Sequence, residues 1–111
     1  KNDTTTTANK IIHKLLHYRI FPDANAKMNC SVKDIDGGIL LISQFTLAAD
    51  TGKGLRPSFS SAAEPSLAQE LYDYTVSTLK SNHTDVATGV FAADMKVHLV
   101  NDGPVTFLLT T

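Results

Sequence analysis

The fold is decided by residues 39–47, Ile-Leu-Leu-Ile-Ser-Gln-Phe-Thr-Leu. Four apolar residues followed by alternation favour a β-strand. Polar side chains enter its second half from Ser43 to Thr46. Inside a sheet such groups need a partner or a ligand. The segment is therefore a candidate site, and an edge strand with one polar face explains the pattern equally well.

On the N-terminal side, Val32–Ile35 precedes Asp36-Gly37-Gly38. Two strand-like runs joined by a short glycine loop predict a β-hairpin made of residues 32–35 and 39–47. On the C-terminal side, Ala48–Ser61 has glycine, proline and no periodicity. We expect a long loop there, and loops of that length often have a function.

Two helices are expected further out. Apolar residues at 11, 12, 15 and 16 have helical spacing, and Asp3 or a threonine of residues 4–7 would cap that helix, which must end before Pro22. A second helix should begin at Pro65, with Ser66 and Gln69 in capping-box spacing. Residues 86–92, 95–100 and 105–109 look like strands. Together these elements predict an α+β fold, a curled, partly closed barrel-like β-sheet with two helices.

Length and charge limit the possible functions. The 111 residues make a single domain, 1–111, whose compact fold would expose roughly 6,000 Å². Ten basic against eleven acidic residues exclude nucleic-acid binding by a bulk positive field, but not by a local patch.

A lone Cys30 forms no internal disulfide, and no apolar run approaches 18 residues. We expect a cytoplasmic protein without a membrane partner. Because the chain opens at Lys1 without methionine, we also expect it to be N-terminally incomplete.

Metal and turn motifs are weak on their own. His13 and His17 have the i, i+4 spacing of a zinc-binding helix, but without a third ligand nearby a solvated helix face is favoured. Asn101-Asp102-Gly103-Pro104 predicts a tight turn between two strands. From composition alone a trans Gly-Pro bond is the more common outcome.

Taken in order, four segments resemble the signature blocks of the D-aminoacyl-tRNA deacylase family. They are Ser43-Gln44-Phe45-Thr46-Leu47-Ala48-Ala49-Asp50, Lys53-Gly54-Leu55-Arg56-Pro57-Ser58-Phe59, Gly89-Val90-Phe91-Ala92-Ala93-Asp94-Met95 and Asn101-Asp102-Gly103-Pro104-Val105-Thr106. The likeness extends from the first helix to Leu109. The pairing of Ser-Gln-Phe-Thr with a later Asn-x-Gly-Pro-Val-Thr is highly specific.

The resemblance implies a barrel-like α+β hydrolase that is an obligate homodimer and uses no metal or organic cofactor. The implied reaction is hydrolysis of the ester of D-aminoacyl-tRNA, and of glycyl-tRNA mischarged on tRNA-Ala. This is chiral proofreading, which recycles tRNA and rejects L-aminoacyl-tRNA. The implied partners are the aminoacylated acceptor end of tRNA and a second copy of the chain.

The resemblance also implies roles for individual residues. Ser43, Gln44, Phe45 and Thr46 match the catalytic strand. Gly103-Pro104 matches a Gly-cisPro motif that reaches into the partner's pocket, where it would clash with an L-side chain. Thr46 is either a nucleophile or a group that positions water; we favour positioning, because no base is evident.

Less specific matches concern RNA contacts. Phe91 and Met95 fall in a block expected to border the adenosine pocket, and Lys53 and Arg56 suit tRNA phosphates, with ordinary solvated charge as the equal alternative. The family pattern begins with strands before the first helix that carry an arginine associated with the active site, and nothing in this sequence matches them. The alternative to an enzyme is a non-catalytic nucleic-acid-binding module on the same fold.

Overall fold

The first helix, α1 (Thr5–His17), begins where the sequence predicts. The computed structural model describes residues 2–111. Thr4 is the N-cap, and its hydroxyl accepts a hydrogen bond from the Thr7 backbone N–H at 3.4 Å, while the Thr4 N–H donates to the Thr7 hydroxyl at 3.3 Å. This reciprocal pair satisfies two N–H groups at the helix start. The helix ends at His17, before Pro22 as expected.

The second helix, α2 (Pro65–Asn82), has proline at its first position. The predicted capping box of Ser66 and Gln69 is wrong. Glu64 is the N-cap and makes no side-chain capping bond. Because Pro65 is already helical, Ser66 lies inside the first turn, where its side chain is not in the capping position.

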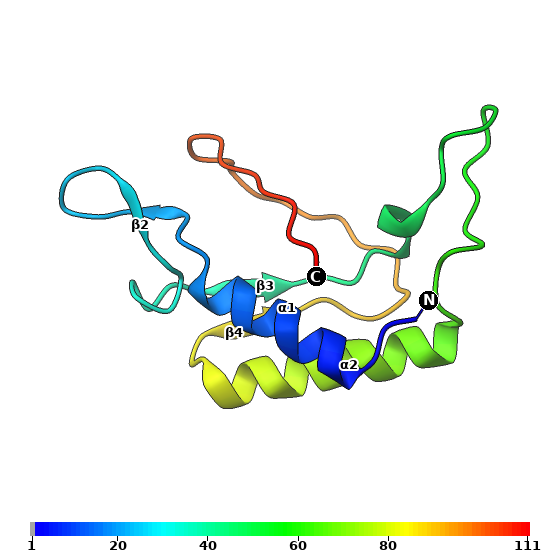
Figure 1. Cartoon of the computed structure of the whole chain (residues 1–111), viewed down its shortest axis with the longest axis horizontal. Helices are drawn as coiled ribbons and strands as arrows, with labels where there is room; N and C mark the ends of the chain where they lie inside the picture. The colour runs from blue at the N-terminus through cyan, green and yellow to red at the C-terminus, as the bar shows by residue number, and fades with distance from the viewer. Residues whose placement is uncertain (1) are drawn as a thin grey trace.

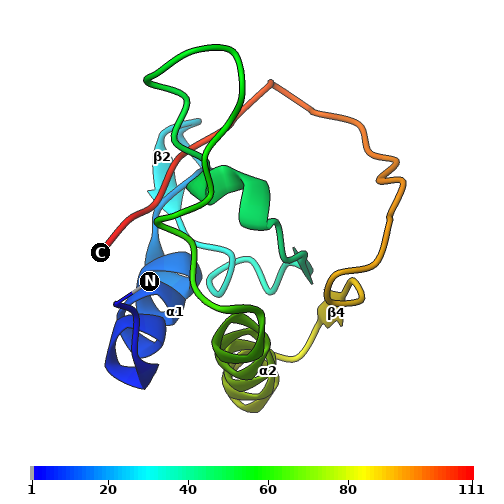
Figure 2. The same cartoon turned by 90° about the vertical axis from the view of Figure 1, so that its right-hand side faces the viewer.

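The core lies between the helices, which run side by side (Figures 1 and 2). Leu79 of α2 is fully buried and packs with Ile12, Leu16 and Val32. Half-buried apolar residues surround this cluster, namely Leu15, Phe21, Ile39, Leu41 and Val86. The core thus fixes one face of each helix against the strands that follow them.

In the described part of the chain, four short strands form two separate sheets. β1 (Phe21–Pro22) pairs with β2 (Met28–Cys30) in an antiparallel arrangement, and β3 (Ile39–Leu41) pairs with β4 (Val86–Thr88) in parallel. α2 lies in the connection between the two parallel strands (Figure 1). The α+β class is confirmed. The sheets are not closed into a barrel.

The predicted hairpin of residues 32–35 and 39–47 is wrong, because residues 32–36 form turns. The Asp34 carboxylate accepts a hydrogen bond from the Ser31 N–H at 2.8 Å, and the Asp34 N–H donates to the Ser31 hydroxyl at 3.1 Å. Such local side-chain bonds compete with a strand ladder. The buried His83 ring then donates to the Gly37 carbonyl at 2.5 Å, which ties this turn to the end of α2. β3 is thereby left to pair with β4.

The strand predicted over 39–47 ends at Leu41, and a 3-10 helix, η1 (Phe45–Ala48), follows. The long loop after it is confirmed. Asp50 and Ser58 pair across it through two backbone hydrogen bonds of 2.7 and 2.9 Å. The loop therefore has a defined base.

The strands predicted at 95–100 and 105–109 are also wrong. Residues 96–109, which we call the C-terminal arm, form no regular structure and run away from the helices and back (Figure 1). Many of its apolar side chains are exposed, and Val100 and Leu108 are 91 % and 88 % exposed. A strand forms only where a second backbone pairs with it, and no other described segment does so. The described chain exposes 8545 Å², well above the roughly 6,000 Å² of a compact fold of this mass.

Among the described residues, neither helix combines the length and the apolar character required to cross a bilayer.

Candidate functional site

A cavity of about 850 Å³ lies beside the point where β3 and β4 end. This volume is typical of small-ligand pockets. It is lined by residues from four segments: Ile42–Phe45 after β3; Phe59, Ser60, Ala62, Ala63 and Glu64 before α2; Pro65, Ala68 and Tyr72 on α2; and Phe91–Met95 and Val97 after β4. Of the predicted site residues, Ser43, Gln44, Phe45, Phe91 and Met95 line it.

The parallel pairing of β3 and β4 explains why these segments meet. Leu41 and Thr88 are partners at the carboxyl ends of the two strands, and the Gly89 N–H donates to the Leu41 carbonyl at 3.0 Å. Residues that follow parallel strands leave the same sheet edge, which is where ligands bind in many α/β proteins. Residues 42–45 and 91–95 therefore form neighbouring walls of one cavity.

The wall after β3 carries the polar groups. Ser43 is half-buried, whereas the Gln44 side chain is exposed and donates from Nε2 to the Thr46 hydroxyl at 2.6 Å. The Thr46 side chain does not line the cavity and contacts it through Gln44. The Phe45 ring packs against Phe59, with centroids 5.0 Å apart. Amide, hydroxyl and aromatic groups thus converge on one side of the cavity.

The wall after β4 is apolar except for Asp94. The Phe91 ring lies 5.9 Å from that of Tyr72, centroid to centroid. Met95 folds over Gly89: a Cβ at that glycine would lie 2.7 Å from the Met95 sulfur. Only a residue without a side chain permits this close approach. Phe91 and Met95 therefore lie in the same wall of the cavity.

The cavity excludes basic side chains. Its lining contains two acidic residues, Glu64 and Asp94, and no lysine, arginine or histidine. Lys53 and Arg56 are exposed on the loop of residues 48–61 and do not contribute to the lining. The cavity thus suits an uncharged or cationic ligand, and a phosphate would have to lie outside it.

Gly103 and Pro104 are joined by a cis peptide bond, as the resemblance implies. Both residues are exposed at the turn of the C-terminal arm and do not line the cavity. Within a single chain the structure does not bring them to Ser43 and Gln44.

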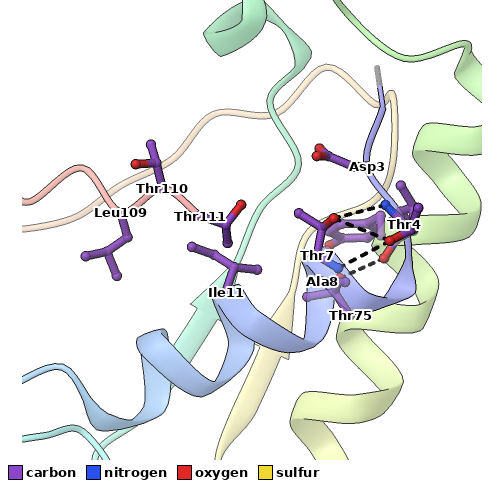
Figure 3. A pocket seen from close by; sticks show the side chains of 11 residues that line it. Asp3, Thr4, Thr7, Ala8, Ile11, Thr75, Leu109, Thr110 and Thr111 are labelled. Atoms are coloured by element: carbon purple, nitrogen blue, oxygen red, sulfur yellow. Dashed lines mark hydrogen bonds between the residues drawn. The ribbon is translucent and has the colours of Figure 1, made fainter.

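A second cavity of about 410 Å³ lies between the start of α1, the middle of α2 and the end of the chain (Figure 3). Its threonines Thr4 and Thr7 bond to each other, and the Thr75 hydroxyl donates to the Leu71 carbonyl at 2.7 Å. Because these groups already have partners and no predicted site residue is present, this cavity is not the candidate site.

The rings of His13 and His17 on α1 lie with their centroids 4.5 Å apart and their planes tilted by 43°. Within residues 2–111, no group of three or more histidine, cysteine, aspartate or glutamate side chains is placed to hold a metal ion.

Tyr72 and Phe59 also line the cavity, although neither was predicted as a site residue. Tyr72 follows Ala68 at helical spacing on α2, and both line the cavity, so this spacing was the available signal. Phe59 ends the signature segment of residues 53–59, which was the available signal, but it lies in a loop without periodicity and its ring was not singled out.

Comparisons with known proteins identify the family. A family model described as D-Tyr-tRNA(Tyr) deacylase matches residues 1–110. A D-aminoacyl-tRNA deacylase of Cellvibrio japonicus is 67% identical over 98% of this chain and 75% of its own length. One of Pseudomonas fluorescens (strain Pf0-1) is 63% identical over 99% of this chain and 76% of its own.

A solved structure also has the same fold. The c-Myc DNA Unwinding Element Binding Protein superposes with a TM-score of 0.87 at 34% identity, covering 94% of this chain and 71% of that chain. Identity of this extent, together with a family model that spans nearly every residue, leaves no other assignment. The chain belongs to the D-Tyr-tRNA(Tyr) deacylase family.

Proposed function

We propose that this protein is a D-aminoacyl-tRNA deacylase, a hydrolase that cleaves the ester between a D-amino acid and the terminal adenosine of tRNA. The observation that carries the proposal is the meeting of Ser43, Gln44, Phe91 and Met95, from distant parts of the sequence, around one cavity. Membership of the family supports the same reaction. Glycyl-tRNA is a second substrate of the same class.

The charge of the cavity suits this substrate. An aminoacyl-adenosine end brings a cationic α-ammonium group and a neutral base, and the lining offers two carboxylates and aromatic rings. Adenine stacks well on aromatic side chains. We assign the base to Phe91 and Met95, and the scissile ester to Ser43 and Gln44.

The contact between Gln44 and Thr46 favours positioning over nucleophilic attack by Thr46. Its hydroxyl accepts a hydrogen bond from an amide N–H, and an amide does not take a proton from a hydroxyl. A hydroxyl without a base is a weak nucleophile. Thr46 therefore orients the Gln44 side chain. An aminoacyl ester is intrinsically labile, so hydrogen-bond donors held in the correct position are sufficient to promote its hydrolysis.

The C-terminal arm supports a homodimer with a cross-subunit site. Gly103 and Pro104 are exposed, and the arm around them presents Val100 and Leu108 almost fully to solvent. Apolar patches of this kind mark protein interfaces. In the dimer we expect the arm to join a curled, partly closed sheet, and its turn to enter the partner's cavity with its backbone facing the α-carbon. A D-side chain would then point away and an L-side chain would clash.

Phosphates are assigned to the loop of residues 48–61. Lys53 and Arg56 are exposed there and outside the cavity, so they are free to contact the acceptor stem while the adenosine is bound. The tRNA substrate places the protein in the cytoplasm. Residues 1–111 act in it as one deacylase-like domain.

The direct test is deacylation of tRNA charged with D-tyrosine, L-tyrosine or glycine. We expect hydrolysis of the D-tyrosyl and glycyl esters and no acceleration for the L-tyrosyl ester. Equal rates on both tyrosyl enantiomers would refute the chiral role. Binding of tRNA without turnover would support a non-catalytic nucleic-acid-binding module instead.

The dimer has a separate test with a matched control. Leu108→Glu places a charge on the arm, whereas Leu55→Glu places the same charge at an equally exposed position on the loop of residues 48–61. We expect size-exclusion chromatography to show a dimer for the wild type and Leu55→Glu, and a monomer for Leu108→Glu. A monomeric wild type would contradict the cross-subunit site.

A further inference from the structure

The hydroxyl of Tyr72 joins α2 to the carboxyl ends of both parallel strands, β3 and β4. It donates to the Leu41 carbonyl at 3.0 Å and lies 3.5 Å from the Gly89 carbonyl. The Leu41 carbonyl also accepts the Gly89 N–H at 3.0 Å, so both of its lone pairs are used. Three segments therefore meet at one half-buried hydroxyl group.

Each strand end leads directly into one wall of the cavity. Leu41 precedes Ser43 by two residues, and Gly89 precedes Phe91 by two. The Tyr72 ring lies against Phe91, with centroids 5.9 Å apart, and itself lines the cavity. The tyrosine therefore contacts the starting points of both walls and the aromatic surface of one of them.

The position of Met95 depends on Gly89, one of the two residues whose carbonyls lie near the Tyr72 hydroxyl. Its sulfur packs over Gly89, at 2.7 Å from where a Cβ would be. A shift of the Gly89 backbone would displace Met95 together with Phe91. The Tyr72 hydroxyl thus adds a side-chain link to the Gly89–Leu41 backbone bond at the start of both walls.

We propose that Tyr72 is a positioning residue of the deacylase: its hydroxyl fixes the spacing of the two walls, and so holds the ester at Ser43 and Gln44 while the adenine lies on Phe91. This inference rests on the proposed function. Displacements of about 1 Å in such a site reduce rates by up to 100-fold. Tyr72 takes no part in bond making or breaking.

The test compares two tyrosines of the same helix. Tyr72→Phe removes the junction hydroxyl and keeps the ring. Tyr74→Phe removes a hydroxyl that donates to Asn9 at 2.7 Å, links α2 to α1 and does not line the cavity. Both variants lose one hydrogen bond from α2, so effects on stability alone should be similar.

With D-tyrosyl-tRNA we expect Tyr72→Phe to lower kcat about tenfold, with KM within twofold of the wild type, because the walls and their ring contacts remain. Tyr74→Phe should retain the wild-type kcat. Tyr72→Leu, which also removes the ring behind Phe91, should raise KM in addition. D-tyrosyl-adenosine should show the same ratios, because the effect lies at the 3′ end of the substrate.

Different outcomes separate the two proposals. If the wild type is active and Tyr72→Phe matches it in kcat, or if both phenylalanine variants lose kcat equally, the positioning role is refuted while the function stands. If the wild type fails to hydrolyse D-tyrosyl-tRNA, the proposed function is refuted, and the role of Tyr72 within it fails too.

Discussion

Replacing Gly103 with alanine tests the turn that we assign to chiral selection. Gly103 has φ = +130°, a conformation that side chains other than hydrogen rarely permit. An alanine Cβ would lie 2.9 Å from Val105 Cγ2 and 3.1 Å from the Val105 backbone nitrogen. The second contact is with backbone and cannot be relieved by rotating a side chain. The turn must therefore change its shape.

The size of the expected loss of activity follows from the backbone conformation of residue 103. A non-glycine residue in a sparsely populated region costs on the order of 1–3 kcal/mol. The turn is exposed and lies outside the core, so in the variant it relaxes to a less strained shape. To bind substrate it must return to the original shape, which costs the same free energy. The competent fraction falls by the same factor. With tenfold per 1.36 kcal/mol, kcat/KM for D-tyrosyl-tRNA should fall roughly 5- to 150-fold.

The assay is single-turnover deacylation of D-tyrosyl-tRNA, with thermal unfolding measured in parallel. The melting temperature should hardly change, because the turn contributes nothing to the core. Gly54→Ala is the control: Gly54 also has positive φ, at +68°, but a Cβ there meets nothing within 4 Å. On D-tyrosyl-adenosine, which lacks the acceptor stem, Gly54→Ala should behave as wild type. A Gly103→Ala enzyme within twofold of wild type would refute the assigned role.

Three further predictions concern the core, the turn before β3 and the basic loop. Leu79→Ala should lower the free energy of unfolding by about 2–5 kcal/mol in denaturant titrations, because its side chain is fully buried; a loss under 1 kcal/mol would contradict this core assignment. The Ser31 N–H, and then its hydroxyl, lower the pKa of Asp34 below 3.8, so this contribution to stability is present above pH 3.8 and is lost as the pH falls through the lowered value. When the free energy of unfolding is measured as the pH is lowered, Asp34→Asn should therefore lose less stability than the wild type. Identical stability–pH curves would exclude this contribution of Asp34. Lys53→Ala and Arg56→Ala should each reduce the salt dependence of tRNA binding by about one unit of slope, and an unchanged slope would leave these residues as solvated charge.

The helices were predictable because their signals are local. The apolar stripe of α1, its threonine cap and Pro65 at the start of α2 act within a few residues of themselves. The hairpin failed because strand pairing depends on which backbone is available. Asp34 and Ser31 closed a turn, and β3 paired with β4, which is more than forty residues away. Periodicity does not report on such a partner.

Site residues with a local sequence signal were also predictable, whereas those that depend on long-range contacts were not. Ser43, Gln44, Phe91 and Met95 were identified from signature segments, and the structure places all of them around one cavity. Tyr72 was missed because its importance lies in two backbone carbonyls, at Leu41 and Gly89, that come together only in the folded chain. Strands were predicted in the C-terminal arm because apolar and polar side chains alternate along residues 95–99. What alternation does not supply is the neighbouring strand.

The cavity walls and the helix core are built from separate residues. Leu79, Ile12, Leu16 and Val32 hold the helices together, and none of them lines the cavity. Residues 42–45 and 91–95 extend from the last hydrogen bonds of the sheet without supporting the packing beneath them. Mutations in the two walls can therefore change which amino acids are accepted with little loss of folding stability. Substrate preference can then evolve among related proteins that keep the same fold.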